Sequence, residues 1–223
     1  MLTELSHSAP RAAHRPGALR PFRSREILIA AAREVFKHQP WQSVSMTEVA
    51  AEAGLTRRTL YNQFANAEEL FRATREDLIL EVARILPLGA PGRLGPTAAL
   101  RAYCNLLSDA FADPRYGELF ASIVRDGWNA PWFIEAYNRH IRVPIARSLE
   151  TYIQALRPTH VLNSADSRHE ALNLLASMES IALSSSLLPG IDQMSPEIAN
   201  CSADFIDGFM ARMSRLSPTA GVQ

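Results

Sequence analysis

Apolar residues recur every three or four positions along most of the chain after Ser24, which is the period of an amphipathic α-helix. The first such segment spans residues 24–37, with Ser24 as its expected N-cap. Further helices are expected at about 97–111, 115–126, 131–156, 167–188 and 196–214. Strand-like alternation never persists beyond a few residues. The pattern therefore predicts an all-α fold.

A short helix is predicted over residues 46–53. Ser45 and Glu48 have the spacing of a capping box, in which each side chain bonds the backbone amide of the other residue. Gly54 follows at the position where a left-handed residue ends a helix. The next helix therefore starts after a tight turn.

That next helix is about two turns long, with Thr56 as its expected N-cap. Leu60 and Phe64 lie on one face of it and are predicted to point inward. Its outward face is polar and consists of Arg57, Arg58, Tyr61 and Asn62. Two short helices joined by a tight turn are typical of a helix-turn-helix, whose second helix enters the major groove of DNA. The alternative is a helical hairpin whose polar face is only solvated.

A long helix is expected over residues 67–86, with Asn66 as N-cap and Glu69 in the capping-box position. The Pro- and Gly-rich segment 87–96 follows it as a loop or domain joint. Further along, Pro144 is expected to kink or divide the helix predicted at 131–156. Residues 1–21, rich in Pro, Ala, Ser, His and Arg, are predicted to form a flexible basic arm.

The segment "VSMTEVAAEAGLTRRTLYNQFANAEELF" (44–71) resembles the DNA-binding part of the TetR family of bacterial transcriptional regulators. The matching features are "EVA", the "AGL" turn, "TLYNQF" and "EELF". The sequence departs from the family pattern at Ala67, where a phosphate-contacting lysine is usual, at Arg58, where a small residue is common, and at Gln63. These departures leave the fold unaffected and make the operator sequence particular to this protein.

The resemblance implies a three-helix DNA-binding domain at 22–71 and a larger helical effector-binding and dimerisation domain at 72–223, bridged by the helix at 67–86. It also implies which residues meet DNA. The expected contacts are Ser45, Thr47, Thr56, Arg57, Arg58, Thr59, Tyr61, Asn62 and Gln63. Arginines of the arm and first helix (Arg11, Arg15, Arg20, Arg23 and Arg25) either add backbone or minor-groove contacts or remain solvated.

Charge supports this assignment because it is unevenly distributed along the chain. The formal net charge is zero, but residues 1–64 carry nine basic and five acidic residues, a net charge of +4. Cys104 and Cys201 are far apart and outside any metal-binding motif, so free thiols, no metal site and no cofactor are expected. No apolar run approaches membrane-spanning length, and we expect a cytoplasmic protein.

A small-molecule pocket is expected around residues 125–144, where aromatic and polar side chains gather. The candidate effector-binding residues are Trp128, Asn129, Trp132, Phe133, Tyr137, His140 and, on a later helix, Met178. Aromatic residues at helical spacing are also typical of a core, and that interpretation stays open. The helices near 167–188 and 196–214 are expected to form a homodimer interface, as the family resemblance implies.

The function expected from these features is that of a repressor. It would bind a palindromic double-stranded DNA operator as a dimer and would be released by a small, largely apolar effector. The alternative is a regulator of the same fold that is effector-insensitive or activating. An all-α enzyme is a distant third because no nucleophile–base motif, phosphate loop or paired metal-binding carboxylates occur in the sequence.

Overall fold

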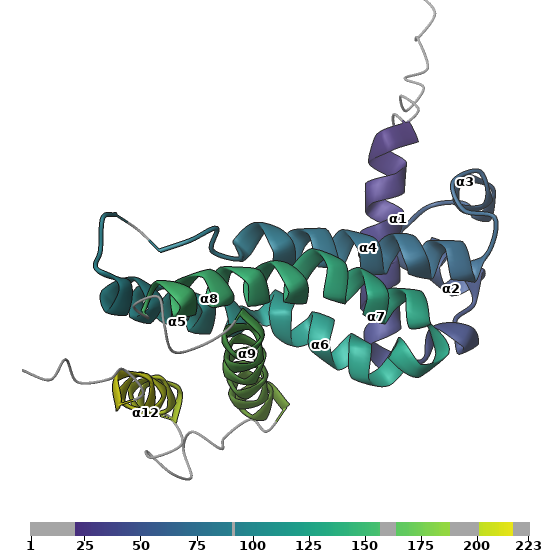
Figure 1. Ribbon diagram of the computed structural model, residues 1–223. Coiled ribbons are helices and arrows are strands. Elements are labelled where there is room, and N and C mark those ends of the chain that lie inside the picture. The colour runs from purple at the N-terminus through teal and green to yellow at the C-terminus, as the bar shows by residue number, and fades with distance from the viewer. Residues whose placement is uncertain (1–20, 91, 157–163, 188–200, 216–223) are drawn as a thin grey trace, which may run out of the picture.

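The computed structural model describes residues 21–90, 92–156, 164–187 and 201–215, and these residues form helices and connecting loops without any strand (Figure 1). Residues 1–20, including Arg11, Arg15 and Arg20 of the expected arm, lie outside the described part, as do residues 196–200 of the last expected helix. The all-α prediction is confirmed for the described residues. The helices in the N-terminal part are α1 (Pro21–His38), α2 (Met46–Glu52), α3 (Arg57–Tyr61) and α4 (Ala67–Ile85).

The C-terminal part continues from α4 through a set of longer helices. These are α5 (Pro96–Phe111), α6 (Pro114–Asp126), α7 (Pro131–Tyr137), α8 (Val143–Ala155), α9 (Ser164–Leu187) and α12 (Cys201–Arg215). Three of them begin with a proline, at Pro96, Pro114 and Pro131, and α1 likewise begins at Pro21. Proline suits this position because its missing N–H would have no partner in the first turn. The sequence thus marks where these helices begin.

The beginning of α1 differs from the prediction. The helix starts at Pro21 rather than after Ser24, and Ser24 lies inside the first turns with only 4% of its surface exposed. The expected N-cap role of Ser24 is therefore wrong. Proline with its preset φ angle takes over the start of the helix three residues earlier.

The long helix predicted at 131–156 is divided, as expected from Pro144. A five-residue π-helix, η3 (Asn138–Arg142), separates α7 from α8, and Pro144 lies in the first turn of α8. Proline lacks an N–H and its ring crowds the carbonyl four residues earlier, here that of His140. The widened π turn accommodates this missing hydrogen bond.

The core of the N-terminal part is built on α1. Figure 1 shows α1 crossing α4 at a steep angle, with α2 and α3 at the same end of the molecule. Phe71 of α4 lies at the centre of the aromatic packing, with its ring centroid 5.4 Å from that of Phe36 and 5.2 Å from that of Trp41. Leu60 and Phe64 are also fully buried there, as the helical pattern predicted.

In the C-terminal part, α9 packs mainly against α8 and also touches α5 and α6, while α12 packs on α5 and α9. Within the described residues no helix is both long and apolar enough to cross a membrane. Cys104 is buried in α5, and burial raises the pKa of its thiol to about 12. It is therefore an inert core residue at neutral pH.

Candidate nucleic-acid interface

The helix-turn-helix is held by local hydrogen bonds that its own sequence provides. Gly54 has a φ of +62°, the left-handed conformation that ends α2 and lets the chain turn. Thr56 then caps α3, because its hydroxyl accepts a hydrogen bond from the Thr59 amide at 3.1 Å. The hydroxyl oxygens of the two threonines lie 2.8 Å apart and share a hydrogen bond.

The predicted capping box at α2 does not form. The Ser45 hydroxyl accepts from the Thr47 amide at 3.2 Å rather than from Glu48. The Glu48 carboxylate instead accepts two hydrogen bonds from the Gln39 side chain, both at 3.0 Å. Ser45 is still the N-cap of α2. Glu48, its expected partner, is hydrogen-bonded to Gln39 instead.

The start of α4 keeps its predicted pattern more closely. The Asn66 side chain accepts from the Glu69 amide at 2.9 Å. The Glu69 carboxylate reaches back to the amide of Ala65 at 2.7 Å, one residue before the cap. Both bonds stiffen the junction between α3 and α4.

The two faces of α3 have opposite character. Leu60 and Phe64 are 0% and 1% exposed and anchor the helix in the core. The opposite face is open to solvent, and Thr59 and Gln63 at its edges are partly buried. The exposed members are Thr56, Arg57, Arg58, Tyr61 and Asn62. Neither Arg57 nor Arg58 forms an ion pair with any residue that the structure describes, so both guanidinium groups are available to a partner.

Further predicted contact residues surround this face. Ser45 and Thr47 are exposed at the start of α2, and Arg23 and Arg25 are exposed in α1. The Arg25 guanidinium carbon lies 5.1 Å from the centroid of the Phe64 ring, a cation–π distance. This contact ties the start of α1 to the segment that follows α3.

A short exposed helix follows a tight turn, packs on a third helix and carries two arginines that have no ion-pair partner in the described part of the chain. These features define a helix-turn-helix DNA-binding protein. The sequence model of the bacterial regulatory proteins of the tetR family matches residues 28–74. Residues 28–74 are therefore a DNA-binding domain of the tetR type, and the chain is a DNA-binding regulator.

Solved structures with the same fold extend the likeness over both parts of the chain. A protein described as a TetR-family transcriptional regulator from Mesorhizobium loti MAFF303099 has a TM-score of 0.65 at 20% identity, over 87% of this chain and 98% of its own. A TetR-family regulator from Streptomyces coelicolor scores 0.62 at 17% identity, over 87% and 96%. The flavonoid-responsive regulator FrrA scores 0.64 at 22% identity, over 86% and 96%. No curated protein matches the chain.

The seven candidate effector residues do not meet in one cavity. Phe133, Tyr137 and Met178 are buried in the core. Trp128 and Asn129 lie in the short 3₁₀ turn Gly127–Asn129, where both are exposed and Trp128 is 91% exposed. The remaining two, Trp132 and His140, line a groove.

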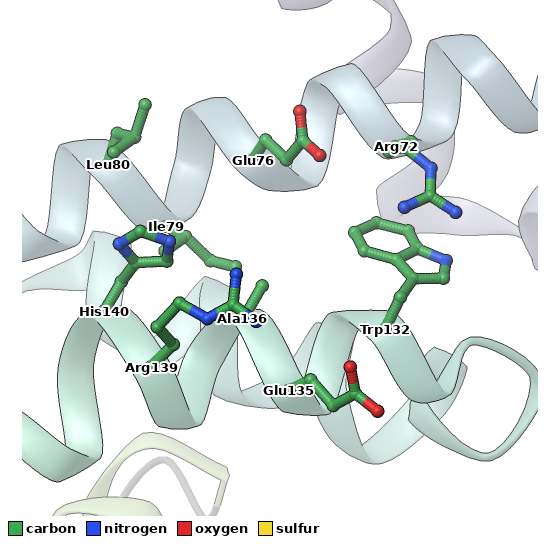
Figure 2. Close-up of a pocket in the computed structure, with 9 residues that line it drawn as sticks. All are labelled: Arg72, Glu76, Ile79, Leu80, Trp132, Glu135, Ala136, Arg139 and His140. Carbon is green, nitrogen blue, oxygen red and sulfur yellow. The ribbon is translucent and has the colours of Figure 1, made fainter.

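This groove has a volume of about 390 Å³ and lies between α4 on one side and α7 with η3 on the other (Figure 2). It is lined by Arg72, Glu76, Ile79, Leu80, Trp132, Glu135, Ala136, Arg139 and His140. Of these lining residues, only Trp132 and His140 were among the candidates expected from the sequence. A signal was present, because the α4 members and the α7–η3 members each recur at intervals of three and four residues, which places each set on one helix face.

A buried polar cluster in the C-terminal part was also missed. The Tyr116 and Tyr137 hydroxyls are 3.1 Å apart, and the Tyr137 hydroxyl donates to Glu179 at 2.6 Å. Arg142 donates to the other carboxylate oxygen of Glu179 at 3.1 Å. Burial raises the pKa of both tyrosines, and Glu179 raises them further, so both stay protonated. The cluster joins α6, α7 and η3 to α9.

A second group of charges joins the DNA-binding helices to the C-terminal part. Arg33 of α1 donates to Glu81 of α4 at 2.6 Å and to both carboxylate oxygens of Glu118 of α6, at 2.6 and 3.0 Å. Hydrogen bonds to these two carboxylates raise the pKa of Arg33 in spite of its partial burial. Arg125 of α6 also donates to the backbone carbonyl of Lys37 at 3.3 Å. Movement of α6 is thereby linked to α1.

Proposed function

We propose that this regulator is a repressor that binds a palindromic operator as a homodimer and is released from it by a small molecule. The observation that carries the proposal is the exposed face of α3, where Arg57 and Arg58 have no acidic partner among the described residues. An exposed arginine without an acidic partner can pair in bidentate fashion with the O6 and N7 atoms of guanine.

Each residue around α3 is assigned a role by its chemistry. Arg57, Arg58, Asn62 and Gln63 carry donors suited to base edges, while Thr56, Thr59 and the Tyr61 hydroxyl suit phosphates. Ser45 and Thr47 lie at the amino end of α2, where the helix dipole favours phosphate. Arg23 and Arg25 extend the basic surface along the first turns of α1. These assignments come from exposure and residue type.

A dimer is needed because a five-residue helix reads too few base pairs to be specific by itself. The face of α9 turned away from the core supports a self-complementary contact. Its exposed residues recur every four positions, at Arg168, Leu172, Ala176, Ser180 and Ser184. The last three of these, from Ala176 on, are small and allow two helices to approach closely. The described part of α12 packs against α9, where Arg212 donates to Glu170 at 2.9 Å, in keeping with an interface near 167–188 and 196–214.

Release by an effector is proposed as a shift between two arrangements of α4. This helix begins three residues after Phe64 and continues into the C-terminal part, so a change in its tilt alters the spacing of two α3 helices in a dimer. FrrA, which has the same fold, is a flavonoid-responsive regulator. A small-molecule effector for this chain is proposed by analogy with that protein.

The test is to select genomic DNA with the purified full-length protein, sequence what is bound and measure affinity by fluorescence anisotropy. We expect a two-fold symmetric site. Arg57→Ala should weaken binding to it by about 1–3 kcal/mol and relax base preference at one position of each half-site. Arg84→Ala, an exposed arginine near the other end of α4, is the matched control and should change nothing.

The outcomes separate the possible roles of Arg57. An equal loss on all DNA sequences would make Arg57 a phosphate contact, and unchanged binding would remove it from the interface. The absence of any selected site would refute operator binding. A reporter gene placed behind the selected site distinguishes repression from the alternative, an activating or effector-insensitive regulator.

A further inference from the structure

The groove between α4 and α7–η3 has the size of a ligand site and a composition unlike that of an ordinary surface. Its volume of about 390 Å³ falls within the range of roughly 300–1,000 Å³ that small-molecule pockets occupy. Its apolar surface comes from the half-buried Trp132 and Ala136, and the buried Ile79 lies beneath them. A flat apolar group of one or two rings fits these dimensions.

The basic residues of the groove point into it. Figure 2 shows the side chains of Arg139 and His140 extending from η3 across the gap toward α4, and the Arg72 guanidinium extending from α4 toward Trp132. The carboxylates of Glu76 and Glu135 stay beside their own helices. None of these five side chains forms an ion pair within residues 21–90, 92–156, 164–187 and 201–215. Arg72 and Arg139 therefore face the gap without an ion-pair partner among the described residues, and the two glutamates lie along its walls.

Trp132 is fixed in place by its neighbours. The Arg72 guanidinium carbon lies 4.2 Å from the centroid of the Trp132 ring, and the Phe71 ring centroid lies at 5.9 Å with its ring edge-on. The indole is therefore a rigid wall rather than a mobile surface side chain. Arg72 is held over it with donors left for another partner, because a cation–π contact uses the face of the guanidinium and not its N–H groups.

The residues that bear these groups come from an unusual turn. Arg139 and His140 lie within the π-helix Asn138–Arg142, and π turns inserted in α-helices are frequent at functional sites. Pro144 accounts for the presence of a π turn at this place. The turn presents two adjacent basic side chains on the side of α4 that carries Arg72.

We propose that this groove binds a small aromatic carboxylate, with its ring on Trp132 and Ala136 and its carboxylate between Arg72 and Arg139, and that this ligand is the effector. The second half rests on the function proposed above. A ligand held from both sides bridges α4 to η3, and α4 leads directly from the DNA-reading helix. Binding that favours one placement of α4 changes operator affinity by the same factor by which DNA changes ligand affinity.

Direct binding is tested by isothermal titration calorimetry of the full-length protein with three probes: salicylate, 1-naphthoate and indole-3-acetate. At least one should bind, and its uncharged primary amide should bind at least about tenfold more weakly, because a charge-assisted pair with arginine is lost. Arg139→Gln and Arg72→Gln should each weaken binding of the acid by about tenfold or more. Arg84→Gln, which removes an equal charge from α4 outside the groove, should leave it unchanged.

Three results would overturn the proposal: no probe binding below about 5 mM, acid and amide binding equally, or Arg139→Gln binding as tightly as Arg84→Gln. Circular dichroism of each variant checks the fold, and Arg139→Lys, which keeps the charge, should restore part of the affinity.

The failure of this proposal is distinguishable from the failure of the proposed function. Calorimetry without DNA reports on the groove alone, and operator selection without a ligand reports on DNA binding alone. A probe that binds the groove while operator affinity stays constant would overturn its role as effector.

Discussion

Arg75 is the residue whose environment is most unusual for its chemistry. Its side chain is 1% exposed, and none of its three nitrogens has a hydrogen-bond partner within the described residues. The nearest carboxylate is that of Asp126, at 3.6 Å and itself 2% exposed, and the rings of Phe36 and Phe71 lie at cation–π distance. Burial lowers the pKa of Arg75 to about 10, an effect that Asp126 opposes. The guanidinium therefore remains charged at neutral pH and depends on Asp126.

Substitution of Asp126 should lower the stability of the fold more than substitution of Arg75. We expect Asp126→Asn to destabilise the fold by about 3 kcal/mol, because it leaves a buried cation without a counter-ion. Arg75→Met should cost less, because Asp126 keeps Arg125 at 2.9 Å. The measurement is urea unfolding at one fixed protein concentration.

The double variant is the control for this interpretation. Arg75→Met should recover much of the stability that Asp126→Asn loses, since no buried charge then remains unpaired. Strictly additive losses would mean that the two side chains act independently and that the aromatic rings alone stabilise Arg75.

At the scale of single helices, side chains at the first residues stabilise the helix by hydrogen-bonding its free amides. Asp113 caps α6, where its carboxylate accepts from the amide of Arg115 at 2.9 Å and from the Arg115 guanidinium at 2.9 and 2.8 Å. The side-chain hydrogen bond from Arg115, followed by the backbone hydrogen bond, lowers the pKa of Asp113 from 3.8 to about 2. The ionised form is therefore the one that the folded state prefers.

This cap predicts a particular pH dependence. A depressed carboxyl pKa stabilises the fold fully above about pH 4, and the contribution is lost as the pH falls through about 2. Asp113→Ala should lower stability by about 1 kcal/mol at pH 7. The difference in melting temperature between wild type and variant should shrink between pH 4 and pH 2. Asp113→Asn, which keeps an acceptor without the charge, should show a smaller loss at pH 7 that also disappears as the pH falls toward 2. A difference that stays constant with pH would exclude the charge as its origin.

At the scale of the whole molecule, α1, α4 and α6 are connected by one set of ion pairs. Arg33 connects all three helices through Glu81 and Glu118, at a place where its side chain is 16% exposed. Charge-assisted hydrogen bonds at such a site fix the relative orientation of the helices as well as stabilising their contact. In the mechanism proposed above, these bonds give α4 a second connection to the helix-turn-helix through α1, besides the chain itself.

Assembly provides the prediction at this scale. Ala176→Arg on the exposed face of α9 should weaken self-association by about 3 kcal/mol or more, because an unpaired charge would be buried between two copies. Binding to a full palindrome should fall with it. Analytical ultracentrifugation and anisotropy measure the two effects. Val124→Arg, an equal change at an exposed site on α6, is the control. A variant that stays dimeric would move the interface away from this face.

Most of the helices and turns could be predicted from the sequence, because their signals act over about four residues. Gly54 at the turn, the Thr56 cap and the inward positions of Leu60 and Phe64 all follow from local hydrogen bonding and helical period. The same locality explains the failure at Glu48. Its local partner was available, but Gln39 from another segment was brought closer by the fold.

Contacts between helices were decided only by the tertiary structure. The candidate effector residues near 125–144 share one stretch of sequence, yet the fold sends Phe133 into the core, leaves Trp128 in solvent and places Trp132 in a groove. Which face of one helix meets which face of another depends on crossing angle and packing, and these are set by the sum of many distant contacts. The pairing of Arg72 with Trp132, and of Arg75 with Asp126, is invisible in the sequence for that reason.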